Sequence, residues 1–86
     1  MQKQNNSTSA QRQRLLERLR HKPCTTVEAR HELDILSAPP RVYELRHQYG
    51  YNIQTEYTNC ENPGGGSHRV GRYVLLQGEW RGGAHE

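Results

Sequence analysis

Two consecutive prolines, Pro39 and Pro40, constrain this 86-residue chain more than any other feature of its sequence. Proline fixes φ and has no backbone N–H, so a helix tolerates it in the first turn and is broken by it further along. Ser37 precedes the pair and is a common N-cap residue, while Gly50 lies where a left-handed C-cap would close the helix. The stretch SAPPRVYELRHQYG therefore predicts a helix that starts at Ser37 and closes at Gly50.

The side chains of this predicted helix divide into two faces at 100° per residue. The inward face collects apolar residues: Ala38, Val42, Leu45 and Tyr49. The outward face collects a different set: Pro40, Tyr43, Glu44 and His47. One face is thus predicted to pack on a core, which leaves the other to contact a partner.

A helix is also predicted upstream, from Thr8 to the residues before Pro23. Thr8 and Gln11 fit a capping box, in which each side chain satisfies a backbone donor at the helix start. Pro23 disfavours helical geometry in the residue before it and so ends the helix. Leucines share one face and arginines surround them: Leu15, Leu16 and Leu19, with Arg12, Arg14, Arg18 and Arg20.

A shorter helix is predicted over residues 26–33, where Thr25 and Glu28 fit another capping box. Asp34 accepts a left-handed backbone and makes the tight turn that follows. The next two residues, Ile35 and Leu36, are expected to reach the core from this turn. The second and third helices are thus joined by a turn of only a few residues.

The remainder of the chain has β-branched and aromatic residues at period two, which indicates strands. Residues 51–58 predict one strand and residues 68–76 a second, joined by the glycine-rich segment 59–67. The predicted architecture is therefore α+β, with three helices followed by a two-stranded hairpin.

Eighty-six residues allow one small domain, because a chain this short buries only about 60% of the surface of its unfolded form. Hydrophobic residues make up 31% of the chain and phenylalanine is absent, so the core is expected to be thin. The predicted organisation is a flexible arm at 1–8, the domain at 9–76 and a flexible tail at 77–86, where Trp80 can pack back on the domain.

The charge balance points to a polyanionic partner. Twelve Lys and Arg face nine Asp and Glu, a formal net charge of +3, and ten of the twelve cations are arginine. The planar guanidinium pairs bidentately with phosphates and base edges. An arginine-rich solvated surface is the alternative that composition alone leaves open.

Several classes of protein are not favoured. Cys24 and Cys60 are too few for a disulfide framework, and neither an apolar run of about 18 residues nor a leader-like start is present. The protein is therefore expected in the cytoplasm.

The sequence predicts no metal or other cofactor, because His21 and Cys24, with Cys60 and His68, lack the paired spacing of zinc ligands. No nucleophile signature, carboxylate pair or phosphate loop is visible, and the chain is not predicted to be an enzyme.

Two short helices joined by a tight turn and followed by a hairpin form the pattern of a winged helix-turn-helix. The DNA major groove is about 12 Å wide and admits a helix, while a hairpin can lie along the adjacent backbone. The candidate DNA contacts are Ser37, Arg41, Tyr43, Arg46 and His47 on the third helix, and Arg69 and Arg72 on the hairpin. Arginine suits guanine edges or phosphates, and tyrosine suits a phosphate or a thymine methyl.

These candidates have structural alternatives. Arg41 can pair with Glu44 three residues on, and Tyr43 can pack under the hairpin. Arginines of the first two helices, Arg30 among them, either contact phosphates or form a solvated face. Since prolines donate no hydrogen bond, base reading would fall to the side chains of the third helix.

Four segments in order, QRQRLLERL, TTVEARHELDIL, RVYELRHQYGYNI and RYVLL, resemble a family of small helix-turn-helix proteins common in phages and prophages of Gram-negative bacteria. The likeness spans Ala10 to Leu76. The resemblance implies a winged-helix fold and a DNA-binding, regulatory role.

The sequence is consistent with two functions. The first is a double-stranded DNA-binding protein, either a phage-type transcription regulator or an excisionase-like factor. The second is a protein-interaction module, such as a small phage inhibitor of a host protein, that uses Tyr43, Tyr57 and the arginine-rich faces. No coiled-coil seam is visible, so a monomer or weak homodimer is expected.

Overall fold

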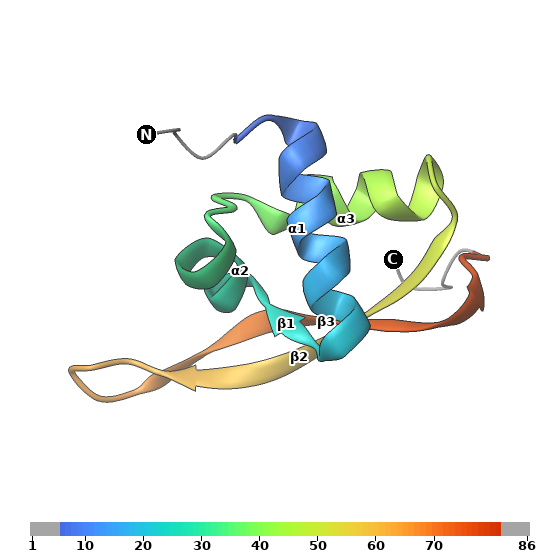
Figure 1. The fold of residues 1–86 in the computed structure, drawn as a ribbon. Coiled ribbons are helices and arrows are strands. Elements are labelled where there is room, and N and C mark those ends of the chain that lie inside the picture. The colour runs from blue at the N-terminus through green and yellow to red at the C-terminus, as the bar shows by residue number, and fades with distance from the viewer. Residues whose placement is uncertain (1–5, 82–86) are drawn as a thin grey trace.

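The computed structural model describes residues 6–81, which form three helices above a long β-hairpin (Figure 1). The α+β order predicted from the sequence is confirmed. The ends of the expected arm and tail, residues 1–5 and 82–86, lie outside the described residues. Among residues 6–81, no helix is long and apolar enough to cross a membrane.

The first helix, α1 (Thr8–His21), begins one residue earlier than a Thr8 cap would allow. Ser7 is the N-cap, and its hydroxyl accepts a hydrogen bond from the backbone N–H of Ala10 at 3.2 Å. The predicted Thr8 capping box is therefore wrong, because serine one position upstream supplies the same acceptor. The helix ends two residues before Pro23, as predicted.

The second helix, α2 (Thr26–Leu33), has the predicted bounds and the predicted capping box. The Glu28 N–H donates to Thr25 Oγ1 at 3.0 Å, and the Thr25 N–H donates to the Glu28 carboxylate at 3.1 Å. Asp34 adopts the left-handed conformation at φ 57°, which makes the turn. Only half of the expected apolar pair reaches the core, since Ile35 is buried whereas Leu36 is 70% exposed.

The third helix, α3 (Ala38–His47), carries both prolines in its first turn. Ser37 is the N-cap residue, but its side chain makes no capping hydrogen bond, so the proline geometry itself starts the helix. Gly50 has φ 78° and its N–H donates to the Arg46 carbonyl at 3.1 Å. The predicted inward face is confirmed except at Tyr49, which is exposed.

The sheet has three antiparallel strands in the order β1-β3-β2. Strand β1 (Cys24–Thr25) was not predicted, because two residues show no periodicity. Strands β2 (Tyr51–Glu61) and β3 (Ser67–Glu79) are longer than predicted and shorten the loop between them. Strand β3 thus continues through Glu79, inside the segment expected to be a tail. The hairpin turn extends beyond α2 in Figure 1.

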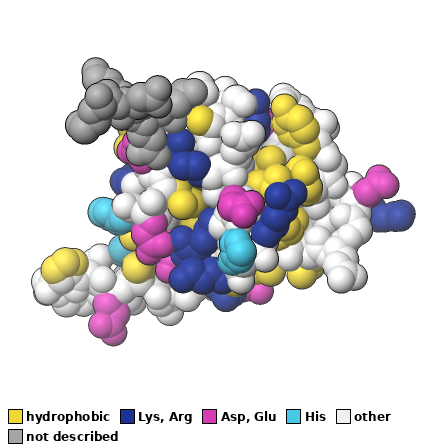
Figure 2. Space-filling view, viewed as in Figure 1, with side chains coloured by type: hydrophobic (Ala, Val, Ile, Leu, Met, Phe, Trp, Pro, Cys, Tyr) yellow, Lys and Arg dark blue, Asp and Glu magenta, His cyan; other side chains and the backbone are white. Residues whose placement is uncertain are grey.

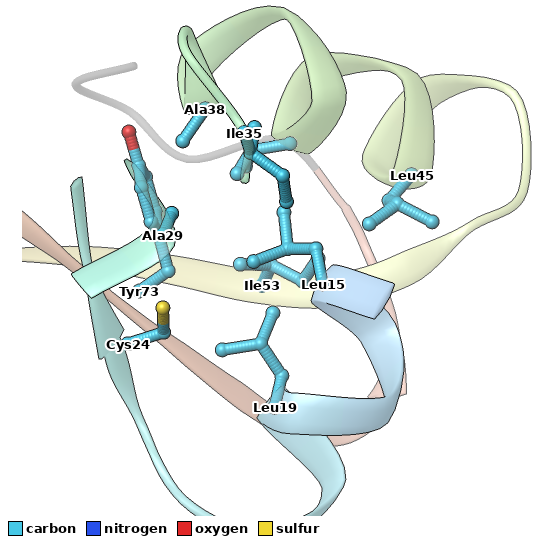
Figure 3. Close-up of a cluster of buried hydrophobic side chains, with 10 residues drawn as sticks. Leu15, Leu19, Cys24, Ala29, Ile35, Ala38, Leu45, Ile53 and Tyr73 are labelled. Carbon is cyan, nitrogen blue, oxygen red and sulfur yellow. The ribbon is translucent and has the colours of Figure 1, made fainter. Parts of the chain in front are cut away.

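The core lies where α1, α2 and α3 meet the helix-facing side of the sheet (Figure 3). Its buried residues are Leu15, Leu19, Cys24, Ala29, Ile35, Ala38, Val42, Leu45, Ile53 and Tyr73. Burial raises the pKa of the Cys24 thiol to about 11, so this sulfur stays protonated at neutral pH. Both cysteines are free, and no group of three or more His, Cys, Asp or Glu side chains that could hold a metal ion occurs among residues 6–81.

Candidate nucleic-acid interface

The outward face of α3 is aromatic rather than cationic. Pro39 and Pro40 are exposed in its first turn, and Tyr43 is 61% exposed one turn later. The Tyr43 and His47 rings are adjacent, with centroids 4.2 Å apart at an interplanar angle of 40°. Two of the predicted contact residues, Tyr43 and His47, are therefore brought together on one surface, which we call the outward face.

Arg41 is directed toward α1 instead. Its guanidinium donates to Glu44 Oε2 at 3.0 Å, and Arg12 of α1 donates to the other carboxylate oxygen at 2.9 Å. Only 14% of the Arg41 side chain is exposed. The alternative raised from the sequence, a pair with Glu44, is the one formed, and it joins α1 to α3.

Arg46 is buried, with 9% of its surface exposed, and does not face solvent as a DNA contact would. Its Nε donates to the Ile53 carbonyl and its Nη2 to Thr55 Oγ1, both at 2.7 Å. The guanidinium also lies 4.3 Å from the centre of the Trp80 ring. The prediction of an exposed position was wrong because Arg46 lies at the boundary between the inward and outward faces, where β2 covers it.

Trp80 follows the end of β3 and packs where α3 meets the hairpin. Its backbone N–H donates to the Gly50 carbonyl at 2.9 Å, and its ring meets His47 edge to face with centroids 6.2 Å apart. Trp80 thus packs back on the domain, which the sequence allowed, although no periodic pattern in residues 77–86 indicated where. The only signal was the single large aromatic residue in an otherwise polar segment.

Arg69 and Arg72 lie on opposite faces of the hairpin, because successive side chains of a strand alternate. The Arg69 guanidinium lies 4.5 Å from the centre of the exposed Tyr57 ring. Arg72 pairs with Glu56, its cross-strand partner, on the other face. Of the two predicted contacts on the hairpin, Arg72 is paired with an acidic side chain, whereas Arg69 is exposed beside an exposed aromatic ring.

The arginines of α1 are largely engaged within the protein. Arg14 donates to the Leu33 carbonyl at 2.7 Å, at the end of α2. Arg18 pairs with both Glu28 and Glu32 of α2, at 3.1 and 2.5 Å. Figure 2 shows the result, a surface on which basic and acidic side chains alternate. This face is not a strongly positive patch, in spite of its many arginines.

The comparisons with known proteins agree with this architecture. Residues 10–78 match the family model described as winged helix-turn-helix domain. Comparison with curated proteins and with solved structures gave no match. Membership of such a family suggests DNA as the partner, and domains of this kind are typically non-catalytic. Because the match covers well over half of its length, the chain belongs to the winged helix-turn-helix domain family.

Proposed function

We propose that this protein binds double-stranded DNA, with α3 in the major groove and the hairpin along the backbone, and that it needs no cofactor. The observation that supports the proposal best is the pairing of one exposed helix face with a protruding hairpin. The outward face presents Tyr43 and His47, and the hairpin presents Arg69 beside the exposed Tyr57 ring.

The contacts divide by chemistry. Tyr43 and His47 can donate hydrogen bonds or pack on thymine methyl groups, and Ser37 can donate to a phosphate. Arg69 supplies a cation for the backbone. Arg41 and Arg46 are bonded within the protein. We therefore expect modest base specificity, since the bidentate arginine–guanine contact is missing from the outward face.

We further propose a cytoplasmic role in transcription regulation or an excisionase-like architectural role. The support is the resemblance of four sequence segments to small phage and prophage proteins. A monomer or weak dimer fits this use, because none of the described helices carries a heptad seam.

Duplex binding tests the proposal directly. A fluorescently labelled pool of random duplexes is titrated with protein between about 50 and about 200 mM salt, where phosphate contacts make affinity fall steeply. Replacing both Tyr43 and His47 with alanine is expected to weaken binding roughly tenfold, as loss of base-edge contacts would. Arg20→Ala, an exposed change on α1, is the control that should bind almost as wild type. Absence of any duplex binding at the lower salt would refute the proposal.

The alternative function, a protein-interaction module, is favoured by one observation. The outward face continues through exposed Pro39 and Pro40 to Leu36, an apolar surface unusual for a DNA reader. Capture of partners from a nuclease-treated bacterial lysate separates the two functions. A DNA-binding protein loses its co-purifying partners after nuclease treatment, whereas an interaction module keeps them in a manner sensitive to Tyr43→Ala.

A further inference from the structure

A concave surface adjoins the apolar end of the outward face, where Leu36 and Pro39 line it. It is a pocket of about 260 Å³ between α2, the turn before α3, and strand β3. Its polar side chains come from three segments of the chain: Thr26, Arg30 and His31 from α2, Ser37 at the start of α3, and His68 from the hairpin. The pocket therefore lies where the helical part of the molecule meets the hairpin.

Arg30 is held in position at this pocket. Its Nη2 donates to the Leu36 carbonyl at 3.1 Å, across the turn that leads into α3. A guanidinium has five N–H donors, so this bond leaves others to contact a ligand. One hydrogen bond thus orients the planar group that binds tetrahedral oxyanions best.

His68 is oriented from the hairpin turn. Its Nδ1 lies 2.8 Å from Asn62 Oδ1, an oxygen that only accepts, so Nδ1 carries a proton. The Nε2 atom becomes a donor once the imidazole is protonated. Cys60 lies opposite His68 on β2, with Glu61 beside it, and Arg30 and His31 face it from α2.

The remaining surroundings are also suited to negative charge. The Ser37 hydroxyl makes no capping hydrogen bond, although it is at the N-cap position. The first turns of α2 and α3 both border the pocket, and helix N-termini carry positive partial charge. None of the described residues that line the pocket is acidic.

We propose that this pocket binds a phosphate group through Arg30, His31, Ser37 and His68. The phosphate can come from a nucleic-acid backbone, in which case the proposal rests on the DNA-binding function above, or from free inorganic phosphate. In either case the site adds a contact on the α2 side of the molecule, separate from Tyr43 and His47.

Inorganic phosphate alone provides the first test. Titration of the full chain is followed through the imidazole resonances of His31 and His68, with sulfate as a second tetrahedral anion. Both resonances are expected to shift saturably as the anion fills the pocket. Arg30→Ala and His68→Ala should each weaken binding at least about fivefold, whereas His21→Ala on α1 should not. A linear response, or equal effects of the three variants, would overturn the proposal.

Duplex DNA provides the second test. If the backbone supplies the phosphate, Arg30→Ala should reduce the slope of log affinity against log salt by about 1, and His68→Ala should weaken duplex binding. An unchanged slope with saturable binding of inorganic phosphate would overturn the DNA source and support free phosphate. Saturable phosphate binding without any duplex binding would refute the DNA-binding function while it supports the pocket. Because His68 lies on the hairpin, its variant does not depend on the turn that Arg30 braces.

Discussion

The arginines of α1 and those of the hairpin have the same chemistry but different surroundings. Arg12, Arg14 and Arg18 each bond to a carboxylate or a carbonyl of another helix or turn. Arg69 projects from the hairpin over the exposed ring of Tyr57. The comparison shows that arginines near one another in sequence need not form a binding surface. In this chain Arg12, Arg14 and Arg18 join the helices to one another, whereas Arg69 stays exposed on the hairpin.

The largest expected effect is that of Arg46→Ala, because this arginine of α3 is also bonded within the protein. The change leaves the Ile53 carbonyl and the Thr55 hydroxyl without their donor and removes the contact beneath Trp80. We expect a loss of about 3 kcal/mol in the free energy of unfolding, because a buried hydrogen-bonded network is broken. Urea unfolding measures it. Arg69→Ala serves as the matched control and should lose less than about 0.5 kcal/mol. Equal losses of unfolding free energy for the two variants would show that Arg46 and Arg69 do not differ in their structural roles.

Arg69→Ala should show the reverse pattern in binding. We expect duplex affinity to fall roughly tenfold at low salt and the salt slope to drop by about 1, because one phosphate contact is lost. Fluorescence anisotropy at several salt concentrations measures both quantities. Arg72→Ala, which removes the ion pair on the opposite face of the hairpin, is the comparison variant. If it weakens binding as much as Arg69→Ala does, the assignment of faces is wrong.

The pH dependence of the free energy of unfolding compares Cys24, which is buried in β1, with Cys60 on the hairpin. Burial raises the pKa of Cys24 from 9.0 to about 11, so the folded state retains a proton that the unfolded chain releases. Its contribution is complete below pH 9 and is lost as pH rises toward 11. We expect about 1 kcal/mol of stability to disappear between pH 9 and pH 10.

Chemical unfolding at a series of pH values detects this loss. Cys24→Ala should flatten the profile in that window, whereas Cys60→Ala on the hairpin should leave it unchanged. A profile that is insensitive to Cys24 would show that other groups control alkaline stability.

The smallest expected effect is that of Glu44→Gln. The carboxylate holds Arg12 and Arg41 together, but the pairs are partly exposed, so we expect a loss of only about 0.5 kcal/mol. Thermal unfolding measures the change. Because the variant releases Arg41, duplex affinity should stay constant or rise. A fall in affinity would mean that the α1–α3 pairing positions the outward face.

Local signals in the sequence predicted the parts of the fold that depend on local chemistry. The capping box of Thr25 and Glu28, the left-handed Asp34 and the prolines of α3 each act within a few residues. What the sequence missed depends on tertiary contacts. Strand β1 exists only because Cys24 and Thr25 pair with β3. Ser7 rather than Thr8 is the N-cap of α1, and the two neighbouring hydroxyl residues look equally suitable in the sequence.

The candidate site was predicted less completely than the fold. Tyr43, His47 and Arg69 were placed correctly as exposed side chains, but whether they touch DNA stays a prediction. Arg46 was misplaced because helical periodicity cannot show that β2 and Trp80 cover the edge of α3. The pocket between α2 and β3 joins residues more than thirty positions apart, and no spacing in the sequence links them.

The junction of α3 and the hairpin has a further experimental consequence. Trp80 is the single tryptophan of the chain, and its indole lies next to both the Arg46 guanidinium and the His47 ring. When the protein is excited at wavelengths that its five tyrosines do not absorb, its emission therefore originates at this one place, beside the outward face. The molecule carries its own optical reporter, which can follow movement of the helix against the hairpin without any attached dye.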